Sequence, residues 1–83
     1  MPNNHKELLK RITLDAKVMA GKPVIKGTRL TVQFILGLLA NGASMNEILD
    51  EYKDLTKEDI LACLSYASEA IDHSTYMTLS TEA

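Results

Sequence analysis

Short loops rich in glycine and lysine can bind phosphate, and the segment Gly21 to Leu30, GKPVIKGTRL, has that composition. A nucleotide-binding P-loop has four residues between its two glycines and a lysine after the second, so that amides and lysine converge on the phosphates. Here five residues separate Gly21 from Gly27, and Thr28 follows the second glycine. The segment is therefore not a P-loop.

The residues that could ligate a metal or attack a substrate are scattered along the chain. His5, Cys63 and His73 share no spacing of the CxxC or HxxxH kind. Cys63 falls beside an apolar stripe at helical spacing and has no neighbouring histidine, so we expect it in the core. His73 lies near a predicted helix end, where the helix dipole accounts for it. The sequence therefore predicts no catalytic residue, no metal, no cofactor and no enzyme.

Charge is divided unequally along the 83 residues, whose formal net charge is -2. Residues 1–30 hold seven cations and two acids, a balance of +5, whereas residues 31–83 hold two cations and nine acids, a balance of -7. We expect the amino-terminal cations to form one contiguous patch that meets phosphates or an acidic partner, and the acidic part to meet a basic one. The alternative is that these charges only solvate the surface.

Length and composition limit the fold to one small domain. The chain is 46% apolar but has one phenylalanine and no tryptophan, so its core must be aliphatic. A domain of this size buries only about 60% of its unfolded surface, which makes self-association, as a homodimer, or a partner chain an expected source of stability. A single cysteine, no apolar run of roughly 20 residues and no signal peptide predict a cytoplasmic protein that contacts no membrane.

The amino-terminal part reads as an arm followed by a β-hairpin region. Residues 1–10 are expected to form an arm with at most one helical turn. Over residues 11–30 apolar and polar residues alternate, which predicts short strands. A tight turn at Gly27–Thr28 should join the run from Pro23 to Lys26 to the run from Arg29 to Val32. Pro23 cannot donate to a ladder, so it belongs at a sheet edge or a strand start.

Apolar residues then repeat at helical spacing and predict three helices, at about 31–41, 44–52 and 56–73. Thr31 should cap the first helix, Ser44 and Glu47 should form a capping box on the second, and Thr56 should cap the third. A single domain, 11–73, then precedes a tail, 74–83. The predicted fold class is α+β, mainly α, with the hairpin region packed on a three-helix, helix-turn-helix-like bundle.

The first predicted helix is apolar on most sides. Phe34 and Leu38 add a second stripe to the one formed by Ile35 and Leu39. Such a helix must be buried on most sides, either at the centre of the fold or in a dimer interface. In either case Gly37 would admit a second backbone.

A helix-turn-helix unit would lay its last helix in the major groove, with Lys57 and Glu58 at base edges and Ala62 and Cys63 as further candidates. Residues 56–59 sum to -1, whereas phosphate neutralisation by cations supplies most nucleic-acid affinity, so the helix can equally be structural. Lys22, Lys26 and Arg29 fall around the predicted hairpin. They could follow a nucleic-acid backbone or bind acidic groups of a protein partner.

GKPVIKGTRL, with RITLD before it and LLANGAS, EILDEY and LTKEDILACLSYA after it, resembles the family called domain of unknown function 433 over about residues 11–70. The resemblance implies short β-elements followed by a homeodomain-like three-helix unit. Some members are similar to VapB-type antitoxins, which are encoded beside PIN-like ribonuclease toxins. The resemblance thus implies an antitoxin that neutralises a toxin and binds its own operator DNA. Ala16 stands where the family usually has proline, which should loosen that turn.

The family has no agreed catalytic residues, so the roles of its signature are interpreted physically. Gly21, Pro23 and Gly27 should shape the hairpin, and Thr28 should hydrogen-bond within the turn. Arg29 would make a bidentate contact with a partner, or else pair internally with an acid such as Asp15. The candidate residues for nucleic-acid or partner binding are Lys22, Lys26, Thr28, Arg29 and Lys57.

Two functions follow as hypotheses. In the first, the protein is a dimeric DNA-binding antitoxin whose basic hairpins contact operator phosphates, while its acidic half or its tail binds the toxin. In the second, it is an interaction module that binds a protein and no nucleic acid.

Overall fold

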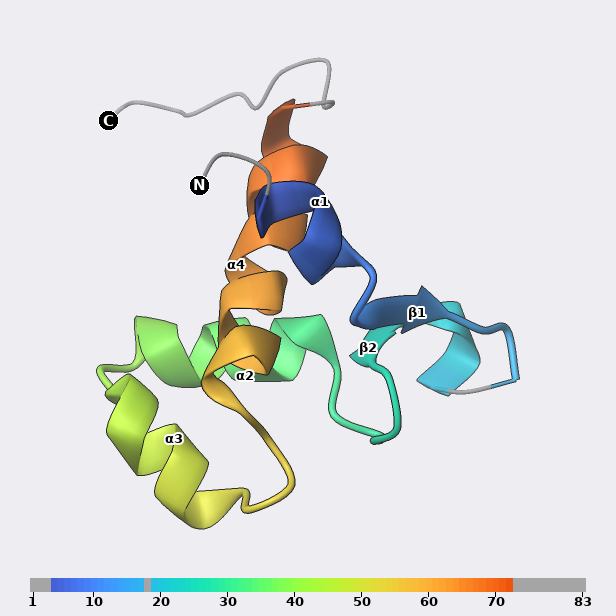
Figure 1. The fold of residues 1–83 in the computed structure, drawn as a ribbon. Helices are drawn as coiled ribbons and strands as arrows, with labels where there is room; N and C mark the ends of the chain where they lie inside the picture. Colours follow the sequence, from blue (N-terminus) through green and yellow to red (C-terminus); the bar gives the residue numbers. More distant parts are fainter. Residues whose placement is uncertain (1–3, 18, 73–83) are drawn as a thin grey trace, which may run out of the picture.

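The computed structural model of the protein describes residues 4–17 and 19–72 (Figure 1). Along this part of the chain the elements are α1 Asn4–Leu9, β1 Ile12–Leu14, the 3-10 helix η1 Met19–Gly21, β2 Pro23–Ile25, α2 Val32–Ala40, α3 Met45–Glu51 and α4 Lys57–Asp72. The predicted fold class, α+β and mainly helical, is confirmed. Residue 73 and the predicted tail lie outside the described residues.

The described part of the amino-terminal arm is a helix that packs on the domain. α1 lies along α4, as Figure 1 shows. His5 Nε2 lies 3.1 Å from Glu69 Oε2, which joins the two helices near the end of α4. The arm therefore belongs to the folded unit.

The sheet has two antiparallel strands, β1 and β2, with Thr13 paired to Val24 and Leu14 to Pro23. Pro23 begins β2, as expected for a residue without a backbone N–H. The predicted tight turn after β2 is also present: the Thr28 N–H donates to the Ile25 carbonyl at 3.0 Å, and Gly27 has φ +81°. Positive φ is the conformation that glycine adopts without steric cost.

One part of the hairpin prediction was wrong. The run from Arg29 to Val32 forms no strand, and only a single bridge joins Thr31 to Val24. The strand that pairs with β2 is β1, which lies before it in the chain. The reason is local, because the Thr31 hydroxyl accepts the Phe34 N–H at 2.9 Å and starts α2 immediately. The helix cap at Thr31 therefore decides the local structure, although apolar and polar residues alternate over residues 29–32 as in a strand.

The other helix boundaries agree with prediction to within a residue or so. Ser44 and Glu47 form the predicted capping box on α3. Thr56 caps α4 in a reciprocal arrangement, since its hydroxyl accepts the Asp59 N–H at 3.2 Å and Asp59 Oδ2 accepts the Thr56 N–H at 3.0 Å. Within the described chain, no helix is both long enough and apolar enough to cross a bilayer.

The core is aliphatic, as predicted, and joins four elements. Its buried members come from β2, α2, α3, the loop before α4, and α4: Ile25, Val32, Ile35, Ile48, Leu55, Ile60 and Cys63. Burial, and secondarily the Asp59 carboxylate, raise the pKa of the Cys63 thiol from 9.0 to about 12. Cys63 is thus a protonated core residue, which confirms its predicted place.

α2 is less covered than its apolar sequence suggests. Phe34 is 40% exposed and meets the Tyr52 ring edge-on, with centroids 5.7 Å apart. A Cβ built on Gly37 would meet no atom within 4 Å, so no second backbone of the described chain packs against Gly37. The first alternative, burial of α2 on most sides at the centre of the fold, is therefore wrong, whereas its burial in a dimer interface stays a prediction.

Candidate functional site

The signature segment folds into the turn region that joins the sheet to α2. Gly21 and Gly27 have φ of +80° and +81°, the conformation that their predicted turn roles require. The Thr28 hydroxyl donates to the Ile25 carbonyl at 2.8 Å and accepts the Leu30 N–H at 2.9 Å. The predicted hydrogen bonding of Thr28 within the turn is confirmed, and this hydroxyl is already committed to the fold.

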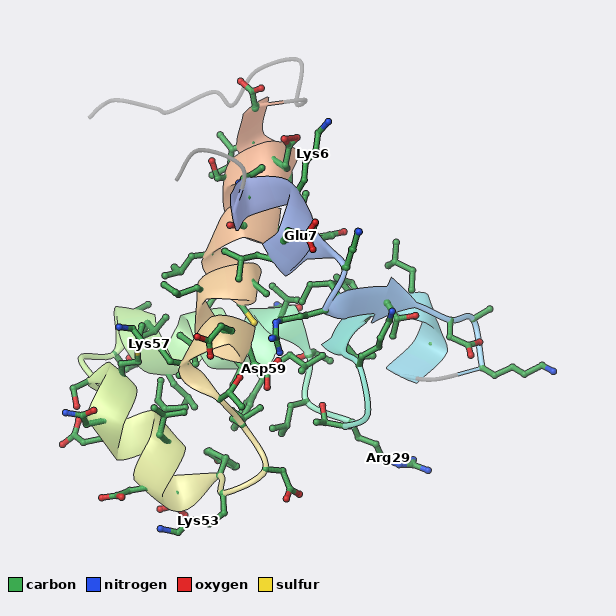
Figure 2. All side chains as sticks on the ribbon, viewed as in Figure 1. Lys6, Glu7, Arg29, Lys53, Lys57 and Asp59 are labelled. Atoms are coloured by element: carbon green, nitrogen blue, oxygen red, sulfur yellow. The ribbon has the colours of Figure 1, made fainter. Side chains whose placement is uncertain are left out.

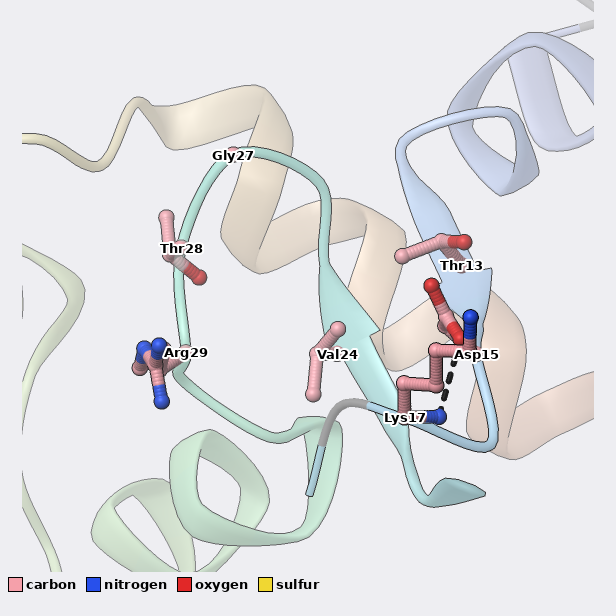
Figure 3. A pocket seen from close by; sticks show the side chains of 7 residues that line it. All are labelled: Thr13, Asp15, Lys17, Val24, Gly27, Thr28 and Arg29. Carbon is pink, nitrogen blue, oxygen red and sulfur yellow. Dashed lines mark hydrogen bonds between the residues drawn. The ribbon is translucent and has the colours of Figure 1, made fainter. Parts of the chain in front are cut away.

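Beside this turn lies a shallow polar hollow, here called the loop hollow (Figure 3). Two cations and one acid are among its lining residues: Thr13, Asp15, Lys17, Val24, Gly27, Thr28 and Arg29. Arg29 lies on one side of the hollow, and Asp15 and Lys17 lie on the other. The loop hollow therefore offers positive charge on two sides.

Arg29 does not make the internal pair that was one of its two interpretations. Asp15 instead accepts the backbone N–H of Lys17 at 2.9 Å, forming an Asx turn across Ala16. Within residues 4–17 and 19–72 Arg29 has no ion pair. Its guanidinium is exposed and available to a partner.

The arginine that does pair internally is Arg11. Its Nη1 lies 3.1 Å from Asp59 Oδ1, and Asp59 is only 8% exposed. This pair joins the chain just before β1 to the first turn of α4, across 48 positions of sequence. Sequence reasoning missed it, although threonine at 56 and aspartate at 59 were a signal that Asp59 is a capping residue.

The expectation of one contiguous basic patch is wrong in three respects. Lys10 forms an ion pair with Glu7 at 3.6 Å, and Arg11 forms one with Asp59. Lys22 lines a different, apolar hollow between α2 and the end of α4. What remains around the turn is a group of three exposed cations without an ion pair to any described residue, here called the loop cations: Lys17, Lys26 and Arg29.

The fifth candidate, Lys57, lies far from this group. In Figure 2 it stands on one side of α4 and Arg29 on the other. Of the acids in the first turn of α4, Asp59 is buried in the pair with Arg11. Lys57 is thus the single cation in that turn, which is poorly suited to contact base edges. The further candidates Ala62 and Cys63 are fully buried, so their expected place at base edges is wrong.

A second hollow lies where the end of α2 meets α3, and its rim is acidic. It is lined by Leu38, Ala43, Glu47, Ile48, Asp50, Glu51 and Tyr52, and is called the acidic groove below. Glu47 is partly engaged by the Ser44 N–H at 2.8 Å, and exposed Asp50 lies 3.8 Å from Lys53. The acidic groove therefore combines carboxylates with an apolar floor and one aromatic ring.

Metal-ligating residues do not gather in the described part of the chain. No group of three histidine, cysteine, aspartate or glutamate side chains there could hold a metal ion. His73 falls outside the described residues.

Three comparisons with known proteins place these surfaces in context. A family model described as "Protein of unknown function (DUF433)" matches residues 12–67. The crystal structure of a DUF433 member protein from Anabaena variabilis ATCC 29413, at 2.00 Å resolution, is 30% identical with a TM-score of 0.70. The match covers 81% of this chain and 66% of that one, slightly under two thirds of its length. A search of curated proteins found no match.

Proposed function

Because the chain belongs to the DUF433 family, whose description assigns no function, we propose one from its surfaces: an antitoxin that binds a PIN-like ribonuclease toxin and its own operator DNA. The observation that supports this most is the separation of charge. Exposed cations gather at the loop hollow, whereas carboxylates surround an apolar floor at the acidic groove. One chain thus carries a surface for a polyanion and another for a cationic protein.

The toxin would bind at the acidic groove. A ribonuclease holds a polyanion, so the rim of its active site is cationic. Asp50 and Glu51 can meet such a rim, and the floor formed by Leu38 and Ile48 can take an apolar side chain beside the contact. Tyr52 adds an aromatic face on which an arginine can stack.

Operator phosphates would bind at the loop cations. Arg29 can contact a phosphate in bidentate fashion, and Lys26 directly precedes the turn at Gly27–Thr28, three residues before Arg29. Asp15 repels a phosphate from the opposite side of the loop hollow, so the phosphate belongs at the Arg29 rim. Contacts of this kind position a protein on DNA without reading sequence.

The second candidate function is an interaction module that binds a protein and no nucleic acid. It is favoured by the small number of loop cations and by the acidic first turn of α4. This module would use the acidic groove alone. The two functions therefore differ only in whether the loop cations bind DNA.

Co-expression with the product of the neighbouring gene tests the toxin contact. We expect the full chain to restore growth and to co-purify with that product. The double variant Asp50→Lys, Glu51→Lys should lose both effects, whereas Glu58→Lys, a single charge reversal outside the acidic groove, should keep them. A neighbour that is not toxic, or a groove variant that still protects, contradicts the proposal.

DNA binding is tested by the salt dependence of affinity for the DNA upstream of the gene. Each phosphate contact lowers the slope of log affinity against log salt by about 0.9. We expect a steep slope for the native chain. Absent or salt-insensitive binding leaves the interaction module as the function.

A further inference from the structure

One face of α4 is largely exposed, although Ile71 at its end also borders the apolar hollow that Lys22 lines. Leu64, Ser68 and Ile71 are spaced by four and three residues, so they share a side of the helix, and Lys57, seven residues before Leu64, extends it. Leu64 is 43% exposed and Ile71 60%. The core face of the same helix, with Ile60 and Cys63, packs against α2 and α3, and α1 packs on it from another side.

The two ends of this face carry charges that oppose the helix dipole. Lys57 opens α4, at the positive end of the dipole, and Asp72 closes it, at the negative end. The last turn contains no basic residue. Neither Lys57 nor Asp72 has an ion pair with any residue in the described ranges. Each charge would therefore be better placed beside the opposite end of another helix.

We propose that this face binds a second copy of the chain, with α4 antiparallel to the partner's α4 and the two-fold axis between Leu64 and Ser65. In that register the helices overlap along all 16 residues, about 24 Å at a rise of 1.5 Å per residue. Lys57 then lies opposite the partner's Asp72, and Asp72 opposite the partner's Lys57. The inference is independent of toxin and DNA binding.

The apolar residues fit the same register. Leu64 packs against the partner's Leu64 at the axis, and small Ser68 lies opposite the partner's Leu61. Ile71 falls against the aliphatic stem of the partner's Lys57. The two copies of Asp72 stand at opposite ends of the contact, so like charges are kept apart.

A second copy matches this face better than another occupant because the face is complementary to itself. A cation at one end, a leucine at the centre and an acid at the other end become their own complement under a two-fold rotation. A parallel arrangement would bring the two Asp72 carboxylates together. Charge thus selects both the occupant and the direction.

Disulfide trapping in the full chain tests the register. Facing residues at the axis of a helix pair reach the Cα separation that a disulfide needs, so Leu64→Cys should cross-link to itself under mild oxidation. Ile71→Cys is the matched control, because the two copies of residue 71 would lie about 20 Å apart along the helix axis. Buried Cys63, with a protonated thiol, does not compete. Cross-linking at both positions, or at Ile71→Cys alone, overturns the antiparallel register.

Charge reversal tests the end contacts by sedimentation. Lys57→Glu should weaken dimerisation about tenfold, since it removes two symmetric pairs, and Lys57→Glu, Asp72→Lys should restore it. Lys53→Glu, the same charge change at an exposed position after α3, should have no effect. Failure of the double variant to restore the dimer overturns the end pairing.

The other occupants give distinct results. A monomer in which the Leu64→Cys thiol resists alkylation indicates that the chain's own tail covers the face. A monomer in which this thiol reacts rapidly indicates a face that is open in the isolated protein. Either result overturns the proposal.

Discussion

Two arginines of this small domain, Arg11 and Arg29, lie in regions that treat charge in opposite ways. Arg11 approaches a carboxylate that is largely withdrawn from water and that also caps α4. Arg29 lies at the rim of a shallow hollow and leaves Asp15 to a local backbone N–H. The contrast teaches that the burial of an acid indicates an internal ion pair better than the closeness of an arginine to that acid in the sequence.

Among the substitutions that test this contrast, removal of the Asp59 side chain should cause the largest loss in the free energy of unfolding. Asp59→Ala deletes the hydrogen bond to the Thr56 N–H and the pair with Arg11, so we expect a loss of about 2–3 kcal/mol in the free energy of unfolding. Urea denaturation measures it. Asp15→Ala, which removes an exposed acid from the other region, should cost well under 1 kcal/mol. Equal losses for the two variants would remove the distinction.

The dependence of stability on alkaline pH is a second test of the buried region. Because the pKa of Cys63 is raised from 9.0 to about 12 in the folded state, the unfolded thiol releases its proton first as pH rises. This contribution to stability is complete below pH 9 and falls between pH 9 and 12, by up to about 1.4 kcal/mol per pH unit. At pH 10.5 the expected loss is about 2 kcal/mol.

The control is the same titration in Cys63→Ala, which keeps the ionisation of lysines and tyrosines. The native chain should lose more stability than this variant over that range. Parallel curves for the two proteins would show that the thiol is accessible in the folded state.

Comparing the arginines directly gives a smaller effect. Arg11→Ala leaves Asp59 without its cation but still bonded to Thr56, so we expect a loss of about 1 kcal/mol. Arg29→Ala should change the free energy of unfolding by less than about 0.5 kcal/mol, yet flatten the salt dependence of DNA affinity by about 0.9. Urea denaturation and DNA titration on both variants separate the roles. An Arg29→Ala protein with reduced stability and an unchanged slope would make Arg29 structural.

The smallest change sharpens the comparison within the turn itself. Thr28→Val keeps the branched shape but removes the hydroxyl that bonds Ile25 and Leu30, and should cost about 1 kcal/mol. Thr28→Ser retains the hydroxyl and should recover most of that loss. Thermal unfolding of the pair measures the difference, and equal melting temperatures would contradict the role assigned to the hydroxyl.

Features set by neighbouring residues could be predicted from the sequence. The caps at Thr31 and Ser44 depend on positions three residues apart, and the turn at Gly27 depends on one backbone angle. Features set across the chain could not. The pairing of β1 with β2, rather than with residues 29–32, and the contact of Arg11 with Asp59 both depend on how the elements pack.

The sequence predicted cations for the candidate site, but only some of them lie together in the structure. Lys26 and Arg29 do flank one turn, whereas Lys22 and Lys57 face other parts of the surface. Lys17 was missed because it precedes the signature and joins it only through the fold. The acidic groove was foreseen only as excess charge, since its floor is assembled from α2 and α3.

The edge-on contact of Phe34 with Tyr52 gives the protein a natural optical probe. The chain has no tryptophan, so its ultraviolet emission arises from three tyrosines, one of which lines the acidic groove. A cationic side chain seated on the Tyr52 ring would alter its emission. Occupancy of that surface can therefore be followed by fluorescence in the unlabelled protein.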